Sequence, residues 1–75
     1  MAKNIHTVHN SDRHMWENKR EGSNTPLSSN HTKQNALDRG AQISKKRHVE
    51  HFIHGKNGKI QERNSYRNDP FPPRG

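Results

Sequence analysis

Alternating apolar and polar residues near the start of the chain predict a β-hairpin. Residues 5–9 are rich in β-forming side chains and stop at a run of turn formers, residues 10–12. Residues 14–20 then alternate with the period of a strand. Trp16, the single tryptophan, is expected in the core because a chain with so few large apolar side chains needs its bulk there.

A second hairpin is predicted near the end of the chain. Residues 49–53 give the strongest strand pattern, with apolar side chains on both faces, as in a strand inside a sheet. Asn57 and Gly58 follow, the pair that a tight hairpin turn prefers because both positions need positive φ. Residues 59–66 provide the returning strand.

The chain between the hairpins has a helical pattern over residues 32–48. Thr32 is suited to the N-cap, where its hydroxyl accepts a bond from the first turn. Small residues recur at helical spacing and form one stripe, so the helix can lie close to a sheet, with Gly40 at the contact. Cations at residues 45–47 complement the helix dipole at its C-terminus.

Together the elements predict an α+β fold of order β-β-α-β-β, in which two hairpins form one antiparallel sheet and one helix packs on a face. Residues 21–26 have the composition of a loop, and residues 27–29 are expected to form an extended bridge. A competing interpretation makes residues 32–54 one long helix, since no proline interrupts them. Strand alternation in residues 49–53, and the strands that an Asn-Gly turn needs on each side, favour the sheet.

Composition limits how stable such a domain can be alone. Of 75 residues only 23% are hydrophobic, and a formal charge of +7 opposes a compact state. We expect one small domain over residues 1–69, more stable as a homodimer or with an anionic partner. Residues 70–75 form a proline-rich tail, either packed across the sheet or free to bind an aromatic groove.

Compartment and partners follow from residue usage. The chain has no cysteine, which excludes disulfides and thiolate zinc sites. No apolar run is long enough for a membrane span or a signal peptide, so we expect a cytoplasmic protein without membrane contact. The positive charge favours DNA, RNA or an acidic protein surface, although it also serves solubility.

Seven histidines raise the question of metal or catalysis. His48, His51 and His54 recur every third residue, and neither a strand nor a helix brings that spacing to one point. A histidine-based nuclease would draw its base, carboxylates and cation from the final hairpin: His51, His54, Glu50, Glu62 and Arg63. No motif fixes those positions. We therefore expect no enzyme, no metal site, no cofactor and no small-molecule substrate.

Nucleic-acid binding is the function that the charge pattern favours. Six cations at the predicted helix end and final hairpin are candidate phosphate contacts: Lys45, Lys46, Arg47, Lys56, Lys59 and Arg63. Such contacts give affinity without sequence choice. Phe52 and Tyr66 are the candidates for base stacking in this region. The alternative is a protein-interaction module, a bacterial or phage-encoded modulator of a host complex, acting through an edge strand or the tail.

The last third of the chain also resembles a known family. Residues 53–66, IHGKNGKIQERNSY, and residues 69–75, DPFPPRG, resemble the DUF2188 family of short bacterial and phage proteins of uncharacterised function. Trp16 with residues 19–23, KREGS, resembles the family's tryptophan strand, and residues 32–41 resemble its helix. The resemblance implies a folded domain and no particular activity.

Overall fold

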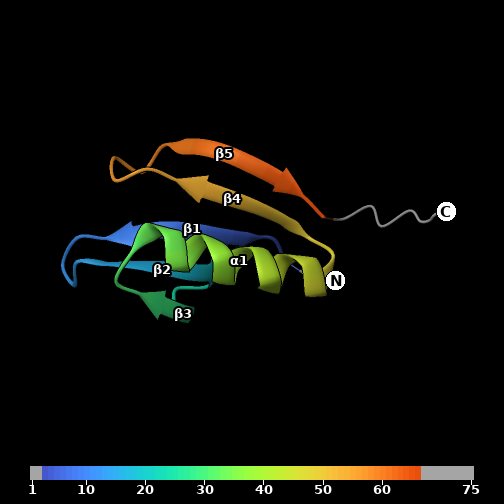
Figure 1. Ribbon diagram of the computed structural model, residues 1–75, viewed down its shortest axis with the longest axis horizontal. Helices are drawn as coiled ribbons and strands as arrows, with labels where there is room; N and C mark the ends of the chain where they lie inside the picture. The colour runs from blue at the N-terminus through green and yellow to red at the C-terminus, as the bar shows by residue number, and fades with distance from the viewer. Residues whose placement is uncertain (1–2, 67–75) are drawn as a thin grey trace, which may run out of the picture.

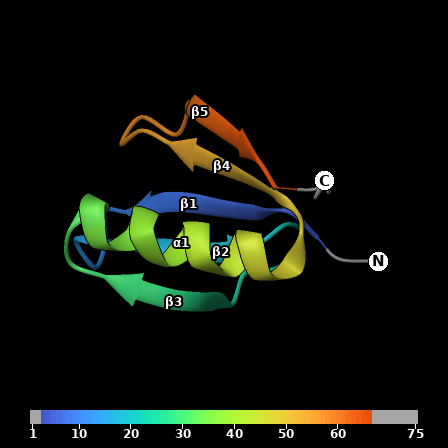
Figure 2. The ribbon, with the colours of Figure 1, turned by 45° about the vertical axis from the view of Figure 1, so that its right-hand side comes forward.

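A computed structural model of the chain describes residues 3–66, which form a five-stranded sheet with one helix on one face (Figure 1). The elements in chain order are β1 (Ile5–Asn10), β2 (Met15–Arg20), β3 (Pro26–Asn30), α1 (Lys33–Arg47), β4 (Glu50–His54) and β5 (Ile60–Ser65). Across the sheet the strands lie in the order β3-β2-β1-β4-β5. Figure 2 shows α1 lying over β1 and β2, with the β4–β5 hairpin beside them.

The predicted α+β class, the single helix and both hairpins are confirmed, but the predicted two-hairpin antiparallel sheet is wrong in two respects. Residues 27–29 belong to a full strand, β3, which pairs antiparallel with β2. In addition β4 pairs parallel with β1, so the sheet is mixed. The parallel pair arises because α1 carries the chain back across the sheet, so β4 starts at the same end as β1.

Both ends of α1 are set by local hydrogen bonds. At the start, Thr32 Oγ1 accepts from the backbone N–H of Asn35 at 3.2 Å, which confirms the predicted N-cap. At the end, His48 adopts a left-handed conformation with φ of 56°, and the next backbone N–H donates to Ser44 O at 3.1 Å. The interpretation of residues 32–54 as one helix is therefore wrong.

The apolar core between α1 and the sheet is small. Its buried hydrophobic side chains are Ile5, Trp16, Ala36, Val49 and Ile53. Trp16 is 7% exposed, so its predicted place in the core is confirmed, and the Lys33 ammonium lies 5.3 Å from its ring centroid. Within residues 3–66 no helix has the length and apolar character that crossing a membrane requires. The predicted tail over residues 70–75 lies outside the described residues.

Polar side chains fill the centre of this core. Asn18 Nδ2 donates to the carbonyl of Ala36 in α1 at 3.0 Å and to Ser28 Oγ in β3 at 2.9 Å. Asn18 Oδ1 therefore faces Thr7 and accepts its hydroxyl at 2.5 Å. With its one proton used, Thr7 Oγ1 accepts from His51 Nε2 at 2.6 Å. This buried network links α1 to strands β1, β2, β3 and β4.

Gly40 allows α1 to approach the buried network. A Cβ atom at this position would lie 2.5 Å from His51 Nε2 and 2.6 Å from Asn18 Oδ1. Both atoms are hydrogen bonded to Thr7 Oγ1 in a close-packed interior, so neither moves without loss of a hydrogen bond. The predicted contact of Gly40 with the sheet is confirmed, and its reason is the polar network.

We expect the substitution Gly40→Ala to destabilise the protein. Overpacking of a core costs about 1–3 kcal/mol, which outweighs the roughly 1 kcal/mol that alanine adds to helix propensity. Urea unfolding should show a net loss of up to about 2 kcal/mol. Gln42→Ala, at an exposed position of the same helix, is the control and should stay within about 0.5 kcal/mol. A more stable Gly40→Ala protein would contradict the assigned contact.

Candidate functional site

The six predicted phosphate contacts do not form one patch. Residues 45–47 lie in the last turn of α1, whereas Lys56 and Lys59 lie on the turn between β4 and β5. That turn is at the opposite end of the molecule (Figure 1). The N-terminus of α1 lies near this turn, because the ammonium of Lys33, the first residue of α1, donates to Gln61 Oε1 in β5 at 2.8 Å. A helix of 15 residues separates the two groups by about 22 Å.

Arg63 and the two aromatic candidates occupy other positions. Arg63 lies on β5 opposite Phe52, and its Nε is 3.9 Å from Glu50 Oε1. Phe52 is stacked against His6 with ring centroids 4.9 Å apart. Tyr66 lies beside the end of α1, where the Lys45 ammonium is 5.7 Å from its ring centroid. Of the two aromatic candidates, Tyr66 lies next to predicted phosphate contacts and Phe52 does not.

The cations of α1 and the carboxylates of the strands differ in whether they have an oppositely charged partner. α1 carries five Lys or Arg side chains and one Asp. In residues 3–66 none of these five cations forms an ion pair. The carboxylates of Glu17, Glu21 and Glu50 lie on strands or turns, where each faces a Lys, His or Arg. We call Arg39, Lys45, Lys46 and Arg47, all exposed, the basic surface of α1.

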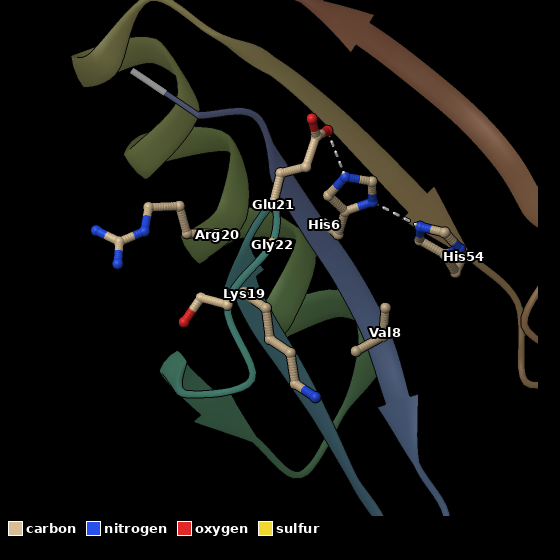
Figure 3. A pocket seen from close by; sticks show the side chains of 8 residues that line it. His6, Val8, Lys19, Arg20, Glu21, Gly22 and His54 are labelled. Carbon is tan, nitrogen blue, oxygen red and sulfur yellow. Dashed lines mark hydrogen bonds and ion pairs between the residues drawn. The ribbon is translucent and has the colours of Figure 1, made fainter. Parts of the chain in front are cut away.

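A pocket of about 290 Å³ opens on the face of the sheet away from α1. Residues 19–23 line it together with His6, Val8 and His54 (Figure 3). Figure 3 shows Glu21 and His54 pointing toward His6 from opposite sides, while Arg20 points away from them. Two of the segments that carry the family resemblance, residues 19–23 and 53–66, therefore contribute to this pocket, the second through His54.

Three hydrogen bonds connect the polar groups of this pocket. Glu21 Oε1 lies 3.0 Å from His6 Nε2, and His6 Nδ1 lies 2.9 Å from His54 Nε2. The other nitrogen of His54, Nδ1, lies 3.1 Å from the carbonyl oxygen of Gly58. The hydrogen bond from His6 lowers the pKa of the Glu21 carboxyl below its usual value.

Sequence reasoning missed His6 and Glu21 as site residues. His6 and His54 are 48 residues apart, and the parallel pairing of β1 with β4 brings them together. No local signal predicts that pairing, because each strand also belongs to a hairpin with its own turn. The resemblance quoted for residues 19–23 and for His54 was the one available hint.

The residues weighed for metal binding and for catalysis do not converge. His48 caps α1, His51 is buried between α1 and the sheet, and His54 lies on the opposite face of β4. Among residues 3–66 no three His, Cys, Asp or Glu side chains are grouped as metal ligands would be. The five nuclease candidates are likewise divided, since Glu62 pairs with Ile53 on the covered face and Arg63 with Phe52 on the other.

His51 is held neutral by its surroundings. Burial lowers the pKa of its imidazole, and this effect outweighs the nearby Glu62 carboxylate, which raises it. The ring donates through Nε2 to Thr7, while Nδ1 is buried without a hydrogen-bond partner. A proton added to Nδ1 would therefore be a buried, unsatisfied donor.

Comparison with known proteins gives a family and nothing more specific. Residues 5–66 match the model of a family described as an uncharacterised protein conserved in bacteria, DUF2188. Comparison with curated proteins and with solved structures gave no match. The suspected family is thus confirmed over most of the chain, and the match includes the whole sheet and α1.

We expect His51 to titrate below the ordinary histidine pKa of about 6.5. Since its folded pKa is lowered, the stability that neutral His51 contributes is present above about pH 6.5 and is lost as pH falls and the unfolded chain takes up the proton. NMR of the ring nitrogens should show the Nε2–H tautomer at neutral pH and a midpoint below 6.5. A midpoint at or above that value would contradict the buried neutral assignment.

Proposed function

The chain belongs to the DUF2188 family, and we propose that it binds nucleic acid through the basic surface of α1. The observation that supports this proposal is the group of exposed cations on α1 that have no carboxylate partner. Arg39, Lys45, Lys46 and Arg47 are exposed and form no ion pair within the described residues, while carboxylates on the other side of the sheet already have partners. Cations of this kind release counterions when they contact phosphates, which drives association.

The basic surface of α1 has a shape suited to a phosphate backbone. Arg39 and Lys46, seven residues apart, line a shallow hollow of about 250 Å³ with Gln42 and Ile43 between them. Two helical turns, about 10 Å, separate the two cations along the helix axis. The four cations of the basic surface would contact the phosphates of the nucleic acid, and the only aromatic ring beside them among the described residues is that of Tyr66. Contacts to phosphates carry no base information, so the proposed binding is independent of nucleotide sequence.

A second candidate function is protein binding along β5. This strand is one of the two edge strands of the sheet, and every residue in it except Asn64 is exposed. Ile60 keeps 57% of its surface accessible, which is unusual for an isoleucine. An edge strand with free backbone groups pairs readily with a strand of another chain or of a second copy. Binding by this route would persist in high salt, in contrast to phosphate contacts.

Two double variants with the same change in charge test the first proposal. Arg39→Gln with Lys46→Gln removes two cations from the basic surface of α1. We expect about tenfold weaker binding to a labelled 20-mer of DNA or RNA in fluorescence anisotropy. The slope of log affinity against log salt should fall by about 1.8, that is, about 0.9 for each lost contact.

The matched control is Lys56→Gln with Lys59→Gln, which removes two exposed cations at the opposite end of the molecule. It should retain affinity within about twofold, beyond the small effect of net charge. Equal losses in both double variants would attribute binding to net charge alone. No salt-dependent binding by the wild-type protein at micromolar concentration would contradict nucleic-acid binding outright.

A further inference from the structure

Of the two edge strands of the sheet, β5 is the one that is not blocked against pairing (Figure 1). The other edge, β3, begins at Pro26, which has no backbone N–H to donate, and its ladder with β2 shifts register between Asn18 and Lys19. From Glu62 to Ser65, β5 contains no proline and its ladder with β4 is regular. A further strand can therefore be added to the sheet at β5.

The backbone groups of β5 that point away from the sheet belong to Arg63 and Ser65. The backbone N–H of Tyr66 donates to the carbonyl of Val49 at 3.2 Å. Antiparallel strands exchange hydrogen bonds at every second residue pair, so Asn64, two residues earlier, also directs its backbone groups toward β4. The alternate residues, Arg63 and Ser65, direct theirs outward, where they can bond another strand.

Pairing of β5 with the β5 strand of a second copy is restricted by symmetry. Two identical edge strands that pair antiparallel are related by a two-fold axis perpendicular to the sheet, so α1 of each copy covers the same face of one continuous sheet. Side chains that stand opposite each other lie on the same face. The axis must therefore pass through one residue, which faces its own counterpart, and that residue fixes every other pair.

Charge excludes the residues at the middle of β5 as the centre. An axis at Glu62 would place two carboxylates directly opposite each other, and an axis at Arg63 would do the same with two guanidinium groups. An axis at Gln61 would place Lys59 opposite Arg63 of the second copy, and would repeat that repulsion by symmetry. Like charges directly opposite each other destabilise a strand pair, so these three registers are disfavoured.

The two ends of β5 are unsuitable for another reason, which leaves Asn64 as the centre. An axis at Ile60 would bring the β4–β5 turn into the ladder, and an axis at Ser65 would pair only residues 64–66 of each described copy. With the axis at Asn64 no like charges stand opposite each other. Arg63 of each copy then exchanges two backbone hydrogen bonds with Ser65 of the other.

This register also gives Glu62 an oppositely charged partner. Glu62 is exposed and forms no ion pair within residues 3–66. It would stand opposite Tyr66 of the second copy, with Cβ atoms about 4.5–5.5 Å apart. Within one copy the Lys45 ammonium lies 5.7 Å from the centroid of the Tyr66 ring. Each Glu62 carboxylate thus comes beside the Lys45 ammonium of the other copy, and symmetry repeats the contact.

We propose that two copies of this protein associate through antiparallel pairing of their β5 strands, with the two-fold axis at Asn64. The proposal rests on the second candidate function, protein binding along β5, and names the partner as an identical chain. Glu62 and Arg63 determine the register, because their charges disfavour the neighbouring alignments. Glu62 in addition favours this alignment through its contact with Lys45 of the second copy.

A disulfide at the axis tests the register directly. The protein has no cysteine, so Asn64→Cys introduces a single thiol. Residues at the axis form a pair without mutual backbone hydrogen bonds, in which the Cα atoms are about 4.5 Å apart. A disulfide spans Cα separations of about 4.4–6.8 Å. Mild oxidation should therefore convert most of the Asn64→Cys protein to a covalent dimer.

Ile60→Cys is the matched control, at an exposed position of the same strand. Ile60 lies four residues from Asn64, so its two copies would be about 27 Å apart along the paired strands. The control should stay monomeric under the same oxidation. Equal cross-linking of both variants would indicate random collision, and no covalent dimer with Asn64→Cys would show that the axis lies elsewhere; either result would overturn the proposal.

Sedimentation equilibrium without nucleic acid tests the contact between Glu62 and Lys45. Glu62→Lys should raise the dissociation constant of the dimer about tenfold, because it opposes two like charges at each symmetric contact. Adding Lys45→Glu to that variant should restore association, since the pair is then reversed in sign. A wild-type protein that is monomeric at about 1 mM, or a double variant as weak as the single one, would overturn the proposal. Nucleic-acid binding by α1 is unaffected by either result, because its own test uses separate variants.

Discussion

The structure depends on one constraint: a chain with few apolar residues must fill part of its core with polar groups, and most of these must be hydrogen bonded to one another. Unsatisfied buried donors cost about 1–3 kcal/mol each, a large share of the stability of so small a domain. Asn18, Thr7 and the Nε2 atom of His51 form a chain of donors and acceptors, and Nδ1 of His51 is the one ring nitrogen in it without a partner. Because Asn18 also bonds the carbonyl of Ala36, the same network positions α1.

Several other features follow from that constraint. α1 must lie close enough for its backbone to be bonded, so Gly40 stands where a side chain would strike His51 and Asn18. His51 reaches Thr7 because β4 lies beside β1, in the parallel pair that the crossover through α1 produces. On the other face the same pairing brings His54 to His6. The pocket and the buried network thus depend on the same pairing of β1 with β4.

How much of this could be predicted depends on the range of each signal. Alternation, the Asn57-Gly58 turn and the Thr32 cap are local, and they placed both hairpins and the start of α1 correctly. β3 was taken for a loop and an extended bridge because its residues, PLSSN, neither alternate nor carry bulk. The β1–β4 pairing has no local signal in the sequence, so the mixed sheet and the contact between His6 and His54 could not be predicted. Charge counting predicted phosphate contacts at the end of α1 and on the β4–β5 turn, and the structure places these two groups at opposite ends of the molecule.

Amide hydrogen exchange at neutral pH tests the central claim that the buried polar network holds the fold together. We predict the slowest exchange in β1, β2 and β4 around Thr7, Asn18 and His51, with β3 and β5 exchanging faster at the edges of the sheet. Protection centred elsewhere, for example on the β4–β5 hairpin or evenly along the chain, would contradict the account.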